Sequence, residues 1–332
     1  VALGVDARRR PLADLPLPLL AYARSNKAWR AQVALAHLLR LSQRRLAGAP
    51  DVFIASDFVL PYLPGTRTVF ILHDLTFALL PQTHSLLNRV YLQWMTPRFL
   101  RAAAHIVAVS ESTRADALRL YGLAPERVHV VYGAAGPEFA PVTEASALAA
   151  VRRRYDLPPR FILFVGTLEP RKNLVTLLKA FTAAQLPEVA LVLAGRAGWR
   201  TAALRRQLAE AGPQVRALGF VPDEDLPALY SLAEAFAFPS LYEGFGLPVL
   251  EAMACGAPVL CSEVASLPEV AGDAARLLPP TDARAWAEAL QRITTDPALR
   301  AELRARGLAQ AQRFSWARAA RQFRQLYRGQ GP

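Results

Sequence analysis

Short apolar runs alternate with longer helical stretches along almost the whole chain, and this alternation narrows the possible folds more than any other feature. Such a pattern is typical of parallel sheets whose buried strands are joined by crossover helices. Because the alternation runs through both halves, the sequence predicts an α/β fold made of two Rossmann-like, doubly wound units.

The expected strands and helices follow directly from this alternation. In the first half, the predicted strands are Val1–Val5, Val52–Ala55, Thr68–Leu72, His105–Ala108 and Val128–Val131. In the second half, they are Phe161–Val165, Ala190–Ala194, Val215–Leu218, Ala235–Phe238, Pro258–Cys261 and Ala275–Leu278. The clearest helices are Ala147–Tyr155, Leu174–Ala184, Leu226–Ala233 (started by Asp223), Val249–Ala254 (started by Pro248) and Trp286–Thr294. A last, arginine-rich helix begins at Phe314-Ser315-Trp316 and ends at Arg328.

The chain length also favours two domains. It has 332 residues, whereas single hydrophobic cores stop growing at about 250–300 residues. The boundary is expected in Gly136–Arg160, where four prolines interrupt the alternation before Phe161 restarts it. We therefore expect the first domain at residues 1–140 and the second at 141–313, followed by the helix at 314–328.

The beginning of the chain departs from this pattern. After Val1–Asp6 the chain runs through Arg8-Arg9-Arg10 into a proline-rich stretch. A doubly wound unit normally places a glycine-containing turn and a helix directly after its first strand. This element is therefore either unusual or lacks residues that follow the first strand in other such units.

Composition excludes several classes of protein. Hydrophobic residues make up 53% of the chain, which is too many for a disordered or fibrous protein. A formal net charge of +12 favours anionic partners: nucleic acid, phosphorylated metabolites or a membrane surface.

The chain contains two cysteines, Cys255 and Cys261, which are too few for a disulfide framework or a four-cysteine zinc site. No apolar run reaches the roughly 18–20 residues of a membrane span, and Leu15–Ala23 is short and broken by proline, so we expect a soluble, cytoplasmic protein.

The sharpest local motif follows the strand at Ala235–Phe238 and extends from Glu243 to Glu251. Gly244 and Gly246 allow a tight turn and a close backbone approach to a ligand, and Pro248 then opens a helix whose free N–H groups suit an anion. Glu243 and Glu251 would flank a phosphate-sized site, with Glu251 in the first helical turn. The alternative is an ordinary strand-to-helix turn with one solvated glutamate and one that stabilises the helix dipole.

A second motif, Gly166-Thr167-Leu168-Glu169-Pro170-Arg171-Lys172-Asn173, also follows a buried strand. Ligands of doubly wound sheets gather at the carboxyl ends of the strands, so this basic pair could neutralise a leaving phosphate. A helix cap with solvated basic residues is the competing interpretation.

Four further features carry weaker signals. His73 ends the strand Thr68–Leu72, where it could contact a substrate or move a proton, although a structural role is common for a single histidine. Val107–Thr113 ends a strand at a serine-rich helix start, which N-capping explains equally well. Asp223-Glu224-Asp225 looks like a two-carboxylate metal site but consists of ordinary capping residues before a helix. The C-terminal arginines lack the interleaved aromatic residues of a nucleic-acid site.

Several segments closely resemble the family-4 retaining glycosyltransferases of GT-B architecture, most like the bacterial mannosyltransferase type. The resemblance covers essentially all of the second half and is looser in the first. It implies two Rossmann-like domains facing across a cleft, with the last helix crossing back to the first. The segments that carry it are Gly166–Asn173, Gly219-Phe220-Val221-Pro222, Phe238-Pro239-Ser240, Glu243–Glu251, Glu251-Ala252-Met253-Ala254-Cys255-Gly256, Ser266-Leu267-Pro268-Glu269-Val270, Leu72-His73-Asp74 and Val107–Thr113.

The resemblance also implies roles for individual residues. Glu243 would hold sugar hydroxyls, Glu251 would bond the ribose, and Lys172 with Arg171 would bind the pyrophosphate. His73 would line the donor sugar from the other domain. The remaining donor-binding residues implied are Gly166, Thr167, Phe220, Val221, Phe245, Gly246 and Leu247.

The chain departs from the family pattern at three places. Many relatives have an arginine where this chain has Thr167, and Arg171 would supply its charge. The usual glycine-rich loop after the first strand is not present, and Val131-Tyr132-Gly133-Ala134 replaces the usual Pro-Asn-Gly-Val.

The function implied is transfer of a hexose, with mannose favoured, from a nucleotide diphosphate sugar to a saccharide or polyprenyl-linked acceptor in bacterial polysaccharide or lipopolysaccharide synthesis. GDP-mannose is the favoured donor, with UDP-, dTDP- and other GDP-sugars open. We expect no cofactor, no metal and no nucleic-acid partner, and association with the inner face of the cytoplasmic membrane through the basic first domain. Two alternatives are a non-catalytic protein that binds a nucleotide or anionic polymer, and a glycosidase that uses Glu243 and Glu251 as its carboxyl pair.

Overall fold

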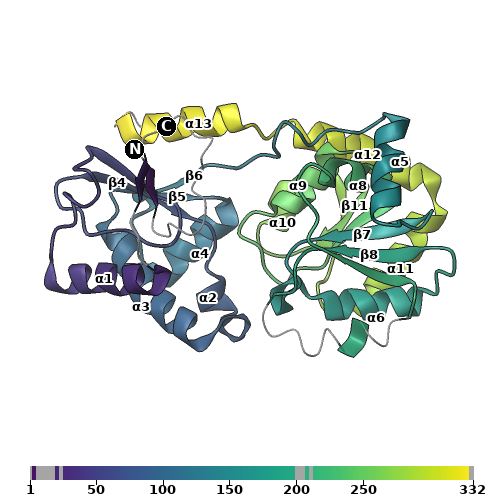
Figure 1. The fold of residues 1–332 in the computed structure, drawn as a ribbon, viewed down its shortest axis with the longest axis horizontal. Coiled ribbons are helices and arrows are strands. Elements are labelled where there is room, and N and C mark those ends of the chain that lie inside the picture. The colour runs from purple at the N-terminus through teal and green to yellow at the C-terminus, as the bar shows by residue number, and fades with distance from the viewer. Residues whose placement is uncertain (1, 5–18, 22–24, 199–205, 209–211, 329–332) are drawn as a thin grey trace.

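The computed structural model describes residues 2–4, 19–21, 25–198, 206–208 and 212–328, and these form two α/β lobes that lie side by side (Figure 1). Each lobe contains a parallel sheet, as the alternation predicted. The segment between them, from the last strand of the first lobe to the first strand of the second, includes the predicted boundary at 140/141.

The second lobe contains a six-stranded sheet in which every neighbouring pair is parallel. Its order is β12-β11-β10-β7-β8-β9, so consecutive strands fill one half of the sheet and then the other, as in a doubly wound fold. All six strands lie where the apolar runs predicted them. In chain order they are β7 (Phe161–Val165), β8 (Ala190–Ala194), β9 (Val215–Gly219), β10 (Ala235–Phe238), β11 (Val259–Ser262) and β12 (Ala275–Leu278).

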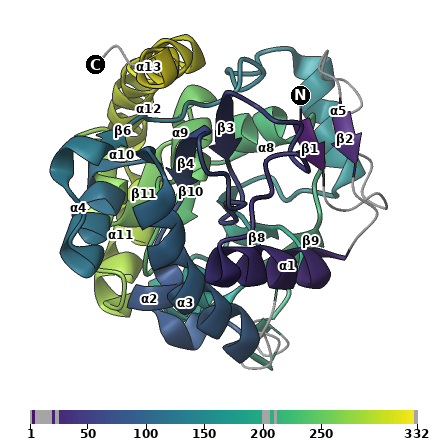
Figure 2. The same ribbon diagram turned by 90° about the vertical axis from the view of Figure 1, so that its left-hand side faces the viewer.

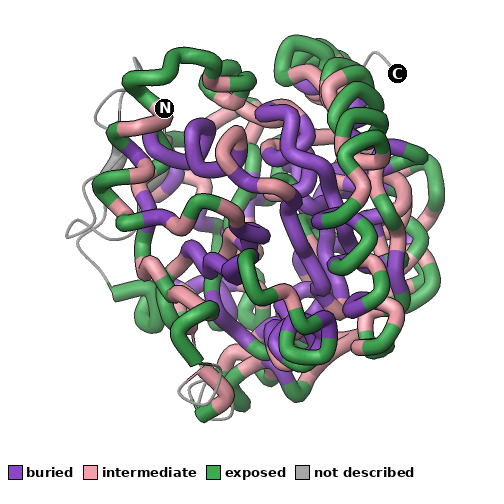
Figure 3. Tube along the Cα trace, turned by 90° about the vertical axis from the view of Figure 1, so that its right-hand side faces the viewer, coloured by how far each residue is buried: buried purple, intermediate pink, exposed green. Residues whose placement is uncertain are grey.

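These strands are buried on both sides, which explains their continuous apolar sequences. Figure 3 shows the buried backbone concentrated in the middle of this lobe, with exposed segments around it. The Phe236 ring stacks on Phe238, and Phe238 stacks on Phe164, with centroids 5.6 and 5.9 Å apart. The helices of this lobe are α5 (Ala145–Arg154), α6 (Leu174–Ala184), α8 (Leu226–Leu232), α9 (Leu247–Ala254), α10 (Leu267–Ala271), α11 (Ala283–Thr295) and α12 (Pro297–Ala311).

The first lobe has a four-stranded parallel sheet in the order β3-β4-β5-β6. The predicted strand at Val1–Val5 overlaps β1 (Ala2–Gly4), but β1 pairs with β2 (Leu19–Ala21) in a separate two-stranded sheet, and the sequence reasoning did not predict β2. Val1, Val5, the Arg8–Arg10 run and most of Leu15–Ala23 lie outside the described residues. The four strands of the main sheet are β3 (Val52–Ala55), β4 (Arg67–Leu72), β5 (His105–Ala108) and β6 (Val128–Val130).

The two faces of this sheet are covered by different parts of the chain. One face packs against helices of the first lobe itself, and Leu92, Phe99 and Ala117 belong to that core. The other face packs against α13 (Trp316–Arg328), which buries Ala319 and Leu326 on it. Figure 1 shows α13 lying along the first lobe after leaving α12 of the second. The helices of the first face are α1 (Asn26–Leu39), α3 (Leu86–Ala102) and α4 (Glu111–Tyr121), and a short α2 (Thr76–Leu79) precedes α3.

One predicted helix start is wrong. The N-cap of α8 is Asp225 rather than Asp223, and its side chain makes no capping hydrogen bond. Instead, the Asp225 carboxylate accepts from Arg154 Nη1 at 2.6 Å and from Tyr155 Oη at 2.6 Å, which fastens α8 to the end of α5. Asp225 therefore forms tertiary hydrogen bonds, although its position before the helix favoured a local capping hydrogen bond.

Candidate active site

The sheet of the second lobe reverses its strand order between β7 and β10, and the loops after these two strands carry predicted donor-site residues. β7 and β10 are hydrogen-bonded neighbours, but the chain leaves them toward opposite halves of the sheet, to β8 and β11. Ligands of doubly wound sheets bind in the crevice at such a switch point. Lys172 after β7 and Glu243 after β10 meet at this crevice.

Four ionisable side chains from these two loops form one cluster. Lys172 Nζ donates to Glu243 Oε1 at 2.6 Å, and Arg171 Nη1 donates to Glu243 Oε2 at 2.7 Å. Arg171 Nη2 also donates to Glu169 Oε1 at 2.9 Å. The ammonium group of Lys172 lies 4.6 Å from the centroid of the Phe238 ring. The cluster contains two cations and two carboxylates, so its formal charge is zero.

Glu243 is ionised at neutral pH. Burial alone would raise the pKa of its carboxyl group, but the charges of Lys172 and Arg171 outweigh burial and hold that pKa at about 2. The sequence reasoning treated the basic pair as free to meet a phosphate. In the structure both cations are already paired with carboxylates, so a ligand must displace or reorient these pairs.

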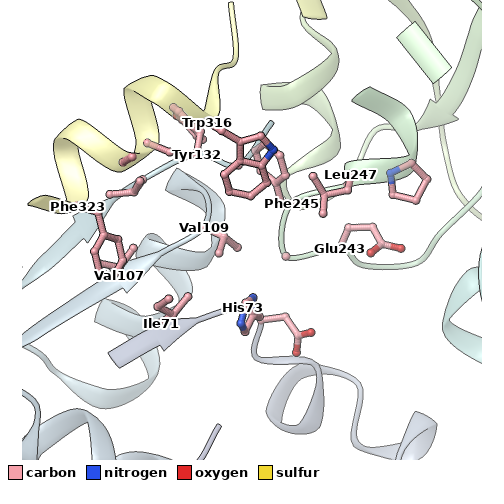
Figure 4. A pocket seen from close by; sticks show the side chains of 18 residues that line it. Ile71, His73, Val107, Val109, Tyr132, Glu243, Phe245, Leu247, Trp316 and Phe323 are labelled. Carbon is pink, nitrogen blue, oxygen red and sulfur yellow. The ribbon is translucent and has the colours of Figure 1, made fainter. Parts of the chain in front are cut away.

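A cavity of about 550 Å³ lies between the lobes, and Glu243 and His73 are on its wall (Figure 4). Figure 4 shows the Glu243 carboxylate turned away from His73, on the second-lobe side. Most of the remaining lining is apolar and comes from both lobes and from α13. These residues include Ile71, Val107, Val109, Tyr132, Phe245, Leu247, Trp316 and Phe323.

The glycine loop of the second lobe touches the first lobe directly. A Cβ at Gly244 would overlap the carbonyl oxygen of His73, so only glycine allows this approach. The Gly244 carbonyl oxygen accepts from Ser110 Oγ at 2.6 Å and from Thr113 Oγ1 at 3.1 Å. Gly246, at a φ of 105°, is the N-cap of α9. Its neighbour Leu247 begins the helix at the edge of the cavity.

The first turn of α4 receives further contacts from the second lobe. Ser110 is its N-cap and accepts from the Thr113 N–H, as N-capping predicted. Glu269 Oε1 accepts from the backbone N–H of Glu111 at 2.7 Å, and Glu269 Oε2 accepts from that of Ser112 at 3.3 Å. A carboxylate at the positive end of a helix dipole is stabilising. The start of α4 is therefore the main polar contact between the lobes in the described residues.

His73 lies at the carboxyl end of β4 and is exposed to the cavity. Its Nε2 donates to the Ser56 carbonyl oxygen at 2.8 Å, and since a carbonyl only accepts, Nε2 carries a proton. Its ring centroid lies 5.9 Å from that of Phe58. These contacts fix the ring at the first-lobe wall of the cavity, and its contact with a donor sugar stays a prediction.

Glu251 differs from the sequence expectation in two ways. It is not in the first turn of α9, and it does not line the interlobe cavity that contains Glu243. Its Oε2 accepts from the hydroxyl of buried Tyr230 at 3.1 Å. Burial raises the pKa of Glu251 to about 7; the charges of Asp223 and Glu138 add to this, and the Tyr230 hydrogen bond opposes it.

This raised pKa predicts a pH-dependent cost in stability. Between the usual pKa of 4.5 and the folded value of about 7, the folded chain keeps a proton that the unfolded chain has lost. The free energy of unfolding therefore falls as pH rises through this window. We expect Glu251→Gln to unfold at the same urea concentration as wild type near pH 4.5, and to be more stable by about 2–3 kcal/mol at pH 8. Glu288→Gln, an exposed change on α11, is the control, and equal stability of Glu251→Gln and wild type at pH 8 would contradict the prediction.

The predicted base-binding residues lie at the end of β9. Phe220 is 56% exposed, and the Arg196 guanidinium group stacks over its ring at 4.2 Å. Val221 is buried, so its side chain belongs to the core. Gly166 and the exposed Thr167 follow β7. The structure places all four at the carboxyl edge of the second sheet, and their contacts with a donor stay predictions.

Two site residues were missed as functional candidates. Glu169 completes the charge cluster, and Glu269 caps α4 across the cleft. Both stand in segments that the sequence reasoning quoted, but only the folded contacts distinguish them from solvated glutamates. Among the described residues, no group of three or more His, Cys, Asp or Glu side chains is placed to hold a metal ion. Cys255 and Cys261 are buried free thiols.

Comparison with known proteins gives consistent results for both lobes. Residues 151–310 match the family described as glycosyl transferases group 1, and residues 5–138 match glycosyltransferase family 4. O-antigen chain mannosyltransferase B of Escherichia coli is 37% identical over 271 residues, which cover 80% of this chain and 71% of that protein.

Two further proteins extend the comparison. The serotype-specific mannosyltransferase WbdA of Escherichia coli is 39% identical over 230 residues, which cover 67% of this chain but 28% of WbdA. The chain therefore spans only about a quarter of that longer relative. A solved structure of sucrose-phosphate synthase from Thermosynechococcus elongatus superposes with a TM-score of 0.73 at 26% identity, over 92% of this chain and 80% of that one.

Proposed function

The chain belongs to glycosyltransferase family 4 and has the GT-B fold, and on this basis we propose that it transfers a hexose, with mannose favoured, from a nucleotide diphosphate sugar with retention of anomeric configuration. GDP-mannose is the proposed donor. The proposed acceptor is a saccharide or polyprenyl-linked saccharide in bacterial polysaccharide or lipopolysaccharide synthesis. The observation that carries the proposal is the Lys172–Glu243–Arg171 cluster at the switch point of the second sheet.

The chemistry of the reaction fits these residues. Cleavage of the bond between the anomeric carbon and the diphosphate oxygen leaves positive charge on the sugar and negative charge on the diphosphate. Lys172, Arg171 and the N–H groups at the start of α9 would stabilise the leaving diphosphate. The acceptor oxygen then attacks the anomeric carbon from the face that the diphosphate leaves, which retains the configuration.

In this proposal the donor rearranges the charge cluster. Both oxygens of Glu243 accept from cations in the structure. When the donor binds, Lys172 and Arg171 turn to the diphosphate, and the freed Glu243 carboxylate accepts from sugar hydroxyls. The neutral cluster therefore exchanges one set of charge pairs for another, without burying an unpaired charge.

The proposed reaction needs no metal ion, because cationic side chains and helix N–H groups meet the leaving diphosphate. We expect purified protein to transfer mannose from GDP-mannose to an octyl α-mannoside at an unchanged rate in excess EDTA, with an α-linked product by NMR. UDP-glucose is the comparison donor. Loss of activity that returns only with added divalent metal would refute metal independence, and a β-linked product would refute retention.

The two alternative functions are separated by simple assays. A non-catalytic binding protein would bind GDP but would neither transfer mannose nor slowly hydrolyse GDP-mannose. The glycosidase alternative loses support because Glu243 lines the interlobe cavity and Glu251 does not.

The proposal also includes a location. If the acceptor is polyprenyl-linked, its lipid lies in a bilayer, so the protein would work at the inner face of the cytoplasmic membrane. None of the helices in the described part of the chain has the length and hydropathy to cross a bilayer. The form of membrane association that we propose is a peripheral contact through the basic first lobe.

A further inference from the structure

Helices α1 and α3 of the first lobe expose apolar side chains that surface helices usually bury. On α3, Leu87 is 80% exposed and Leu86 is 68% exposed. Val90 lies one turn further along the same stripe and is 54% exposed, and Trp94 lies one turn beyond Val90 and is 42% exposed. A contiguous apolar surface of this kind marks an interaction site. The exposed apolar residues of α1 and the residues just after it are Leu35, Leu38, Leu39 and Leu41, each between 51 and 59% exposed.

The two helices present these side chains on one surface. Both bury their inner stripes in the same core, on one face of the first sheet. They also touch, since Arg30 of α1 donates to Asn88 Oδ1 of α3 at 2.7 Å and stacks over Tyr91 at 5.1 Å. Figures 1 and 2 show α1 and α3 next to each other. The two helices therefore lie against each other on the same side of the first lobe. We call their outward stripes together the basic apolar face.

The two segments that contain these helices carry charges of a single sign. Residues 25–50 and 75–110, which contain both helices, have no Asp or Glu at all. Arg98 stacks on exposed Trp94, 4.6 Å from the ring centroid. The basic residues of these two segments are Lys27, Arg30, Arg40, Arg44, Arg45, Arg89, Arg98 and Arg101.

We propose that the basic apolar face binds the surface of an anionic lipid bilayer. Its leucines and Trp94 would enter the boundary between headgroups and acyl chains, while the lysine and arginines meet lipid phosphates, as in helices that lie in the interfacial plane. A second copy of the chain fits this face poorly. A symmetric dimer would place the two basic faces opposite each other, and residues 25–50 and 75–110 offer no carboxylate to pair them.

This inference rests on the membrane location proposed above and names the surface that makes the contact. The test measures flotation of the full chain with vesicles, without donor or acceptor, so its outcome does not depend on whether the chain transfers a sugar. We expect binding to vesicles of phosphatidylcholine with phosphatidylglycerol to be at least about tenfold stronger than to phosphatidylcholine alone. High salt should weaken it, because screening reduces attraction between exposed charges. Equal binding to the two vesicle types, or none to either, would overturn the proposal.

Variants identify the surface. The double variant Leu87→Glu, Trp94→Glu should reduce binding to the anionic vesicles about tenfold or more. It loses two apolar side chains that would enter the bilayer, and it gains two negative charges that the anionic lipids repel. Leu120→Glu, on exposed α4 of the same lobe, is the matched control and should bind as wild type. Thermal unfolding of each variant checks that the lobe is folded. Wild-type binding by the double variant would overturn the proposal, as would a dimer in sedimentation that the double variant abolishes, which would assign the face to a second copy.

Discussion

Lys172→Ala should reduce the rate of glycosyl transfer at saturating donor by about 10²- to 10³-fold. Removal of one preorganised donor from a developing negative charge raises the barrier by roughly 3–4 kcal/mol in other enzymes. Lys172 is one of two cations paired with Glu243, and Arg171 stays after the substitution. We therefore expect the loss in kcat rather than in folding, measured as initial rates with radiolabelled donor and as thermal unfolding.

Two variants make this result specific. Lys179→Ala removes an exposed lysine from α6 of the same lobe and should retain wild-type kcat. Lys172→Arg keeps the charge and should recover part of the lost rate. If Lys172→Ala retained kcat within a few-fold of wild type while folded, Lys172 would have no part in stabilising the diphosphate.

Gly244→Ala should have the second large effect, by preventing the lobes from meeting. The new methyl group would overlap the His73 carbonyl oxygen, which is backbone and cannot rotate away. Separation of the lobes would also break the hydrogen bonds from Ser110 and Thr113 to the Gly244 carbonyl. We expect transfer to fall at least about 100-fold, because a near-attack geometry depends on both lobes. Small-angle scattering should show a larger radius of gyration.

A glycine in the same cavity provides the control. A Cβ at Gly133 would make ordinary contacts of 3.5–3.6 Å with Phe245, Leu247 and Trp316. Gly133→Ala should therefore leave the radius of gyration unchanged. GDP binding should survive in Gly244→Ala, since the predicted nucleotide residues belong to the second lobe. An unchanged radius and rate in Gly244→Ala would show that the observed lobe contact is not needed for transfer.

The sequence was a good guide to the strands of the second lobe and a weaker guide to local details. A strand that is buried on both faces must be apolar throughout, so runs such as Phe161–Val165 are readable without context. Asp225 shows the limit of such reasoning, because its bonds to Arg154 and Tyr155 come from a helix some 70 positions away. β2 was missed since its three residues have no distinctive pattern.

The sequence predicted where the candidate site lies, but not how its charged side chains are paired. Doubly wound topology alone puts the loops after β7 and β10 at the ligand crevice, so Lys172 and Glu243 could be identified from strand positions. Their direct pairing joins residues 71 positions apart, and the contact of Ser110 with Gly244 joins residues 134 apart. Sequence spacing contains no information about such pairs. The neutral cluster and the contacts at the start of α4 could therefore be identified only from the folded structure.

The contact between α4 and the second lobe has a consequence for hybrid enzymes. Ser110 and Thr113, in the first half of the chain, donate to the Gly244 carbonyl in the second half. The neighbouring backbone N–H of Glu111 donates to Glu269, also in the second half. A chimera that grafts a relative's first half onto the second half of this chain would inherit only one side of the junction. Exchange of the first half should therefore work best when the new half has two hydroxyl side chains to meet the Gly244 carbonyl and a helix start to meet Glu269.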